Sequence, residues 1–171
     1  TIIDGSNDVN GSVVQFNNNE TTAELNGFIL QNGSGNNIVG FGRDGGGISC
    51  TNSSPVLKNL HITHNGYGSN STHHGGGIFG FDECNITLEN VVISNNQAQS
   101  NGAVYLGNSS DISFNNVTII NNSDSDGSTI KLEWVSGTLT NVTIANNTSN
   151  SSWQLEAANY LDDSLPGLMF I

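Results

Sequence analysis

The sequence predicts an all-β protein, a right-handed single-stranded parallel β-helix of about six coils. The first observation is a repeat, Leu-x-Asn-apolar-x-Ile-x-x-Asn, whose second and third copies begin at Leu57 and Leu88. The unit recurs along the 171-residue chain with successive periods of 32, 31, 26 and 25 residues, because its copies begin at Leu25, Leu57, Leu88, Phe114 and Leu139. Fixed periods of this size are typical of stacked repeat folds.

The second observation is the alternation of apolar and polar residues inside each unit. Leu57, Leu60 and Ile62 are apolar, whereas Lys58 and His61 are polar. Alternation of this kind predicts strands with one buried face. No stretch has the 3.6-residue periodicity of a helix long enough to pack on a sheet.

A further short strand precedes each unit and follows glycine residues. Its copies span residues 11–16, 45–50, 75–80, 102–106 and 127–132. Each coil therefore holds two or three short strands joined by turns, and equivalent residues of successive coils form ladders. Right-handed connections are the rule for parallel strands. Two interior ladders are predicted: Val14, Ile48, Ile78, Val104 and Ile130, and then Leu30, Ile62, Ile93, Ile119 and Ile144.

Two ladders of asparagine are predicted at the turns between strands. They consist of Asn59, Asn90, Asn116 and Asn141, and of Asn65, Asn96, Asn122 and Asn147. A side-chain amide can donate and accept hydrogen bonds along the stack, and it can satisfy turn backbone. We expect Asn116 to be buried and bonded to the neighbouring coils.

Residues 45–62 read Gly-Gly-Gly-Ile-x-Cys-x-x-Ser-Ser-Pro-x-Leu-x-Asn-Leu-x-Ile. This stretch resembles the repeat of secreted right-handed β-helix proteins of the pectate-lyase-like superfamily. It is also similar to the repeats of polymorphic outer-membrane proteins. The resemblance covers roughly residues 1–150 and implies the fold and a secreted or cell-surface location. Its motif residues are core and turn positions, so it implies no catalytic residue.

Composition limits the partners. The net charge is −12 with three basic residues, which excludes nucleic acid, because phosphate binding needs clustered Lys and Arg. A polysaccharide or a cell-surface glycan is the expected partner, and a polyanionic sugar would need a bridging cation. No apolar run is long enough to span a membrane. We expect one domain over 1–171, with 151–171 as an end cap or the start of further coils, and possible end-to-end or neighbouring-domain contacts.

The two cysteines are predicted to be unpaired. Cys50 falls on the inward ladder with Gly80, Leu106 and Leu132, whereas Cys84 lies in a turn of the next coil and not directly above it. A disulfide is the alternative.

The candidate binding site lies where two long loops, 34–44 and 66–74, stack on one edge. Outward residues of the first strand would form an exposed aromatic strip beside these loops, and rings with nearby polar groups suit a sugar. In the alternative, the loops cover the rings. The candidate ligand-binding residues are Arg43, His73, His74, Phe79, Phe81, Tyr105, Lys131 and Glu133.

We predict no transition-metal site and no cofactor. Adjacent residues of a strand point in opposite directions, which argues against His73 and His74 as joint ligands. Calcium is possible at Asp124-Ser125-Asp126-Gly127, or at Asp4, Asp8 and Asn10, although ordinary turn residues are the favoured interpretation.

The sequence thus predicts an extracellular or cell-surface structural or adhesion module that interacts with carbohydrate. A polysaccharide lyase or glycoside hydrolase fragment is the alternative, but the basic residues Arg43, Lys58 and Lys131 and the acidic residues Asp44, Asp82, Glu83 and Glu133 form no convincing catalytic group. Ice binding is a second alternative. Outward rows containing Thr87 and Thr138, and Thr118 and Thr143, suit it, but bulky residues interrupt them.

Overall fold

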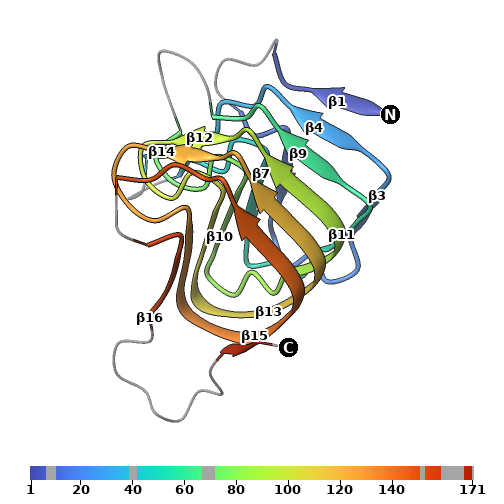
Figure 1. Ribbon diagram of the computed structural model, residues 1–171. Coiled ribbons are helices and arrows are strands. Elements are labelled where there is room, and N and C mark those ends of the chain that lie inside the picture. The colour runs from blue at the N-terminus through green and yellow to red at the C-terminus, as the bar shows by residue number, and fades with distance from the viewer. Residues whose placement is uncertain (7–10, 39–41, 67–71, 151–152, 159–167, 171) are drawn as a thin grey trace.

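A computed structural model describes the chain except for residues 7–10, 39–41, 67–71, 151–152, 159–167 and 171. The described residues form about five turns of a parallel β-solenoid with no helix among them (Figure 1), which confirms the predicted parallel β-helix. The sequence predicted about six coils. The described residues thus hold about one turn fewer than predicted, and β16 (Leu155–Ala158) and β17 (Leu168–Phe170) both pair in parallel with β15 (Ile130–Ala145).

One row of parallel strands forms the first side of the coils. It consists of β2 (Val14–Phe16), β7 (Ile48–Thr51), β10 (Ile78–Phe81), the start of β13 (Val104–Ile120), the start of β15, and β16. The register joins Val14 to Ile48, Ile48 to Ile78 and Val104 to Ile130. This is the first predicted interior ladder. Its members from Ile48 to Ile130 are buried.

The remaining sides carry two more rows. One holds β3 (Glu24–Asn26), β8 (Val56–Lys58) and the start of β11 (Thr87–Ser94). The other holds β1 (Ile2–Asp4), β4 (Ile29–Gln31), β9 (His61–Thr63) and the end of β11. β13 and β15 run through all three sides and pair with each other. The second interior ladder is also confirmed, because Leu30, Ile62 and Ile93 are adjacent in register and fully buried.

Two small sheets lie outside these rows. β5 (Asn36–Ile38) and β6 (Gly42–Asp44) form an antiparallel hairpin in the first long loop. β12 (Gln97–Ala98) and β14 (Ser123–Asp124) form a parallel pair. Among the described residues, no helix has the length and apolar character needed to cross a membrane.

The asparagines of the second predicted ladder, which we call the inner ladder, are Asn65, Asn96, Asn122 and Asn147. The first three are fully buried. The Nδ2 of Asn65 donates to the Oδ1 of Asn96 over 2.9 Å and to the Leu30 carbonyl over 3.1 Å. The main-chain N–H of Asn65 also donates to the Oδ1 of Asn96, over 3.0 Å. The inner ladder therefore satisfies buried main chain as well as its own amides.

The residue before each inner-ladder asparagine has a left-handed backbone. His64 has φ 55°, and Asn95, Asn121 and Asn146 take its place in the later coils with φ 53°, 56° and 54°. Asparagine tolerates this conformation better than most residues. His64 therefore stands at a turn position that normally favours asparagine.

Cys50 and Cys84 form a disulfide with a Cα–Cα distance of 5.9 Å, so the prediction of unpaired thiols was wrong. The reason lies at Gly80, which is adjacent to Cys50 in register. A Cβ at Gly80 would lie 2.9 Å from the Cys84 sulfur. The missing side chain leaves interior space that Cys84 enters from its turn.

Candidate functional site

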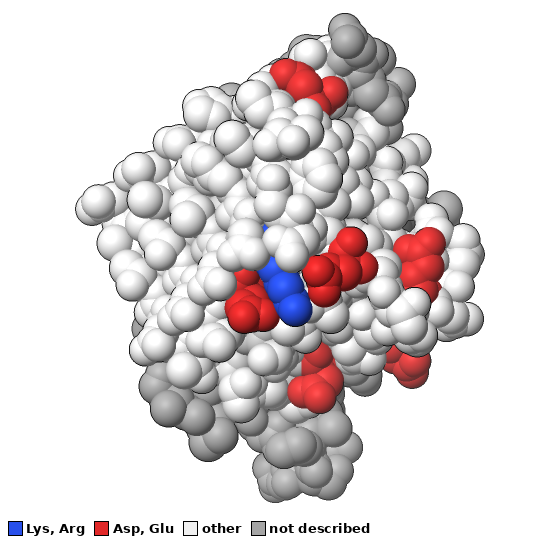
Figure 2. Space-filling view, turned by 90° about the vertical axis from the view of Figure 1, so that its right-hand side faces the viewer, with Lys and Arg blue, Asp and Glu red and all other residues white. Residues whose placement is uncertain are grey.

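Charged side chains are sparse, and Lys58 and Lys131 each lie beside two carboxylates. Figure 2 shows one side of the solenoid as a mostly uncharged surface with a basic side chain flanked by acidic groups. Lys58 Nζ lies 3.5 Å from Glu24 and 3.7 Å from Glu89. Exposed pairs of this kind add little stability. The two carboxylates favour the charged, protonated form of Lys58, which argues against its use as a catalytic base.

The predicted aromatic strip exists, but it is not an exposed platform. Phe79 and Tyr105 stack with ring centroids 5.4 Å apart, and Phe81 lies 6.2 Å from Phe79. Phe79 is 0% exposed and Tyr105 is 7% exposed, so the alternative of buried rings is the correct one for these two. Gly107 assists the packing, because a Cβ there would lie 3.3 Å from both the Phe81 ring and the Tyr105 hydroxyl. Neither Phe79 nor Tyr105 offers an open face to a sugar.

Four of the predicted residues nevertheless meet in a cavity of about 340 Å³, which we call the polar cleft. It lies over the first-strand row of β13, β15 and β16. Of the eight residues predicted for the site, His74, Tyr105, Lys131 and Glu133 line it. The full lining is His74, Ser100, Asn101, Tyr105, Asp126, Gly127, Lys131, Glu133 and Glu156.

Hydrogen bonds and ion pairs fix the side chains of the polar cleft. The Tyr105 hydroxyl donates to Glu133 Oε2 over 3.0 Å. Lys131 Nζ lies 3.9 Å from Glu133 and 3.5 Å from Glu156. Ser128 donates to the second oxygen of Glu156 over 3.2 Å. Burial, and then the bond to Glu133, raise the pKa of Tyr105, so its phenol remains a protonated donor at neutral pH.

Glu156, which lines this cleft, and Trp153, which lies near it in sequence, were not among the predicted site residues, because both lie in the segment 151–171 that was expected to be an end cap. Trp153 is 64% exposed. It lines a second cavity of about 340 Å³ together with Leu155, Glu156 and Ala157, so Glu156 borders both cavities. The alternation of Leu155 and Glu156 could have indicated another first-strand copy, in which Glu156 follows Lys131 in the outward row.

Arg43, His73 and His74 gather beside the cleft at the edge of the hairpin. The main-chain N–H of His73 donates to the Arg43 carbonyl over 2.5 Å. His74 packs against Tyr105 with ring centroids 5.4 Å apart. Asp44 is fully buried, and its Oδ1 accepts from the His74 main-chain N–H over 2.8 Å. Of the described residues in this group, His74 alone lines the polar cleft.

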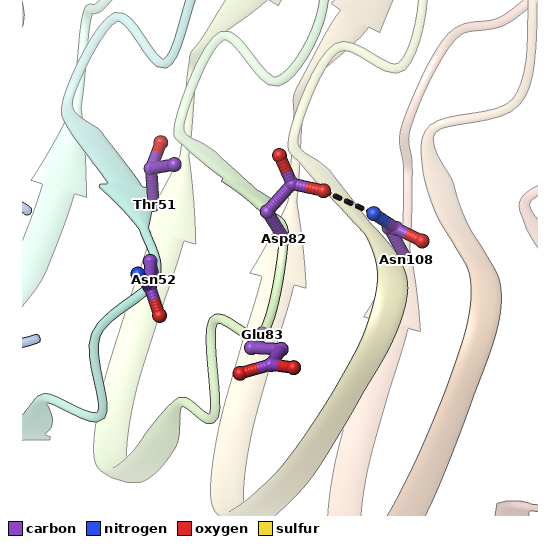
Figure 3. Close-up of a pocket in the computed structure, with 5 residues that line it drawn as sticks. All are labelled: Thr51, Asn52, Asp82, Glu83 and Asn108. Carbon is purple, nitrogen blue, oxygen red and sulfur yellow. Dashed lines mark hydrogen bonds between the residues drawn. The ribbon is translucent and has the colours of Figure 1, made fainter.

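A third cavity, of about 500 Å³, lies at the turn after the first strand (Figure 3). It is lined by Thr51, Asn52, Asp82, Glu83 and Asn108. Asp82 and Glu83 have left-handed backbones with φ 51° and 58°, and Asn108 donates a hydrogen bond to Asp82. The two carboxylates line a different cavity from Glu133 and Lys131. None of the described residues that line this turn cavity is aromatic or basic.

The calcium candidates remain predictions. Asp124 is 7% exposed, and its Oδ2 has no hydrogen-bond partner. Burial raises the pKa of Asp124 to about 6, so its carboxyl group takes up a proton at mildly acidic pH. Asp4 is exposed, and hydrogen bonds from Gln31, Asn32 and Ser6 lower its pKa. Asp8 and Asn10 lie outside the described residues.

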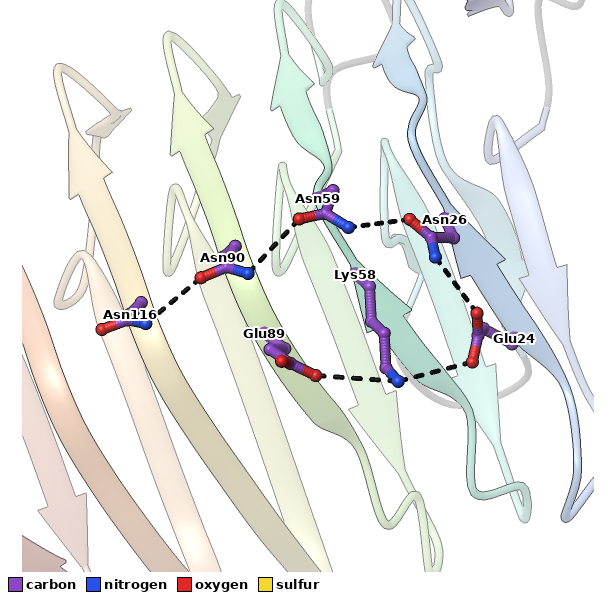
Figure 4. Close-up of polar contacts among 7 residues, drawn as sticks. All are labelled: Glu24, Asn26, Lys58, Asn59, Glu89, Asn90 and Asn116. Atoms are coloured by element: carbon purple, nitrogen blue, oxygen red, sulfur yellow. Dashed lines mark hydrogen bonds and ion pairs between the residues drawn. The ribbon is translucent and has the colours of Figure 1, made fainter.

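The first predicted asparagine ladder lies on the outer surface beside Lys58 (Figure 4), and we call it the outer ladder. Its amides bond from coil to coil, as predicted, through Asn26, Asn59, Asn90, Asn116 and Asn141. Asn116 is exposed, however, so its predicted burial was wrong. Its φ of 56° shows why asparagine stands there, since the turn needs a left-handed residue.

The threonine rows considered for ice binding have the predicted register. Thr118 pairs with Thr143, but Val92 and then His61 precede them. The described surface therefore offers no uninterrupted threonine row along these ladders.

Comparison of the chain with protein-family models, with curated proteins and with solved structures gives no match.

Proposed function

We propose that this chain is an extracellular or cell-surface module that binds carbohydrate at the polar cleft and at Trp153. The observation that carries the proposal is the shared residue Glu156, which borders both the cleft and the cavity lined by the exposed Trp153. An aromatic face next to fixed polar groups is the arrangement that a sugar ring fits, because its C–H face is apolar and its rim carries hydroxyls.

The charges of the cleft indicate the class of sugar. Asp126, Glu133 and Glu156 supply three carboxylates against the single cation of Lys131. Carboxylates accept hydrogen bonds from sugar hydroxyls and from ammonium groups, and they repel anionic sugars. We therefore propose a neutral or amino sugar rather than a uronic acid polymer.

The disulfide supports the proposed location. Cys50 and Cys84 form a disulfide that lies wholly in the core. Disulfides persist in oxidising compartments and are rare in reducing ones. We also propose that the chain is secreted, that its role is adhesive and that it belongs to the pectate-lyase-like superfamily. The parallel β-helix fold is compatible with all three proposals.

The proposal is tested by glycan-array binding followed by titration calorimetry with the best ligand. Trp153→Ala should weaken binding by about tenfold or more, because a stacked ring contributes on the order of 1 kcal/mol beyond its buried area. Glu156→Gln should also weaken binding. Glu89→Gln is the matched control, because Glu89 flanks Lys58 as Glu156 flanks Lys131. Equal affinities for the wild type and Trp153→Ala would contradict the proposal.

A glycoside hydrolase is the second candidate, and one observation favours it. Glu133 and Glu156 come from neighbouring coils, and both lie within 4 Å of Lys131 Nζ, at 3.9 Å and 3.5 Å, so the cleft holds two carboxylates near one substrate position. A reducing-end assay on the bound glycan separates the candidates. New reducing ends that disappear in Glu133→Gln would identify an enzyme, and binding without product would identify a module.

A further inference from the structure

The side chains of Asp44, His73 and His74 converge at the edge of the hairpin, beside the polar cleft. Each offers one potential ligand atom, and the three atoms lie within 4.8 Å of one another. The Nδ1 atoms of His73 and His74 are 3.3 Å apart, and His74 Nδ1 is 3.0 Å from Asp44 Oδ1. We propose that these residues form a binding site for a divalent transition metal, with Zn²⁺ as the fitting ion.

The spacing matches a zinc coordination sphere. Nitrogen and oxygen ligands lie about 2.0–2.1 Å from zinc, so neighbouring ligand atoms of a tetrahedral site are about 3.3 Å apart. The two observed separations, 3.3 Å and 3.0 Å, are close to that edge length. Two imidazoles and one carboxylate also form a ligand set that zinc accepts, with a fourth position left for water or a ligand group.

One proton cannot serve both short contacts of His74 Nδ1. His74 Nδ1 faces both His73 Nδ1 and Asp44 Oδ1, yet a neutral imidazole nitrogen carries at most one proton. If His74 Nδ1 donates to Asp44, it cannot accept from His73. If it accepts from His73, its lone pair faces the carboxylate. A metal ion resolves this conflict, because all three atoms can then present lone pairs to one cation.

Asp44 supplies an independent observation. Its side chain is fully buried, and its Oδ2 has no hydrogen-bond partner. A buried carboxylate with one unsatisfied oxygen is costly unless a cation or donor neutralises it. The carboxylate is held by the His74 main-chain N–H, which donates to Oδ1 over 2.8 Å. A bound dication would compensate the buried charge and would give Oδ2, which lacks a hydrogen-bond partner, a cation beside it.

The backbone explains why sequence reasoning rejected this pair of histidines. The argument that adjacent residues point in opposite directions holds inside a regular strand. His73 lies in a bend, and His74 forms only an isolated bridge, with Asp44 on one side and Ser100 on the other. The two rings can therefore meet edge to face, with centroids 4.6 Å apart.

The test is calorimetric titration of the full, untagged chain with ZnCl₂, together with visible absorption of the Co²⁺-substituted protein. We expect one zinc per chain, a rise in melting temperature with zinc, and the intense absorption of four-coordinate Co²⁺. His73→Ala should weaken zinc binding by about tenfold or more, as should Asp44→Asn. His73 is exposed, so its removal leaves the core intact if Asp44→Asn fails to fold.

His64→Asn is the matched control, because the later coils carry asparagine at its turn position. It removes a histidine from the turn that precedes the second long loop and should leave zinc affinity unchanged. Absence of one-to-one zinc binding in the wild type, or equal losses in His64→Asn and His73→Ala, would overturn the proposal. The inference does not depend on carbohydrate binding, which Trp153→Ala and Glu156→Gln test separately.

Discussion

The inner and outer ladders use the same residue in the same coils for different physical purposes. Both join side-chain amides from coil to coil over similar distances, for example 2.9 Å between Asn65 and Asn96 and 3.1 Å between Asn141 and Asn116. The inner amides are buried and also bond to main chain, whereas the outer amides are exposed. A repeated asparagine therefore identifies a turn. It does not show whether the turn needs the hydrogen bonds of the asparagine side chain or the left-handed backbone that asparagine tolerates.

At the inner ladder the side chain is what matters. Asn96 accepts from the main-chain N–H and the amide of Asn65, and it donates to the Ile62 carbonyl over 2.9 Å. At the outer ladder the backbone is what matters. Asn90 has φ 55°, and Gly27, with φ 82°, takes the equivalent position in the first unit. Removing the two side chains should therefore have unequal effects.

The largest effect is expected for Asn96→Ala. The change leaves the main-chain N–H of Asn65 and the carbonyl of Ile62 without their partners in a buried place. We expect a loss of about 2–4 kcal/mol in the free energy of unfolding, since each orphaned buried group costs about 1–3 kcal/mol. Urea denaturation followed by circular dichroism measures it. Asn96→Gly should be no milder, because Asn96 does not have a left-handed backbone.

Asn147→Ala examines the C-terminal member of the inner ladder. Asn147 is half-buried and accepts from Asn122, but none of the described bonds links its Nδ2 to a further amide. We expect a loss of about 1–2 kcal/mol, because water can reach the groups left behind. A loss larger than that of Asn96→Ala would show that burial does not set the difference between the ladders.

Asn90→Ala and Asn90→Gly separate backbone from side chain at the outer ladder. Asn90→Ala should lower the free energy of unfolding by about 1 kcal/mol. The left-handed conformation strains a residue that has a Cβ, and alanine has no polar side chain that could hydrogen-bond to the nearby backbone. Glycine should change stability by less than about 0.5 kcal/mol, because it adopts this conformation without strain. The same denaturation experiment decides. A glycine variant as unstable as the alanine variant would show that the exposed amide bonds contribute after all.

The last prediction concerns pH rather than an asparagine, and it applies to Asp124, which lies two residues after Asn122. Burial raises its folded pKa to about 6 from the ordinary 3.8. The folded state therefore holds this proton more tightly than the unfolded chain, and the resulting stability is lost as pH rises from about 4 to about 6. Asp124→Asn should flatten the stability profile in that window. Melting temperatures across it provide the measurement, and an unchanged slope would contradict the burial argument.

The fold was predictable because its determinants are local and periodic. The repeat spacing and the apolar alternation identified both interior ladders correctly, including Ile93 and Ile119. The pairing of Cys84 with Cys50 was not predicted, because it depends on the space that Gly80 leaves in three dimensions. Trp153 and Glu156 were not predicted as site residues, because the sequence repeat is weak in the segment where they lie. The periodicity of the sequence thus predicts the course of the backbone. The candidate site depends on residues that depart from this periodicity.

The two ladders point in opposite directions along the stack. In the amide-to-amide bonds of the inner ladder, each Nδ2 donates toward the C-terminal coil, from Asn65 to Asn96 and from Asn96 to Asn122. Outer Nδ2 groups donate the other way, from Asn116 to Asn90 and from Asn90 to Asn59. The outer chain of bonds reaches the carboxylate of Glu24 through Asn26. The amide dipoles of the two ladders therefore oppose each other, and sheets add little net dipole of their own. Unlike a helix, whose ends carry partial charges, this stack could gain or lose a coil with little change in the electric field at its ends.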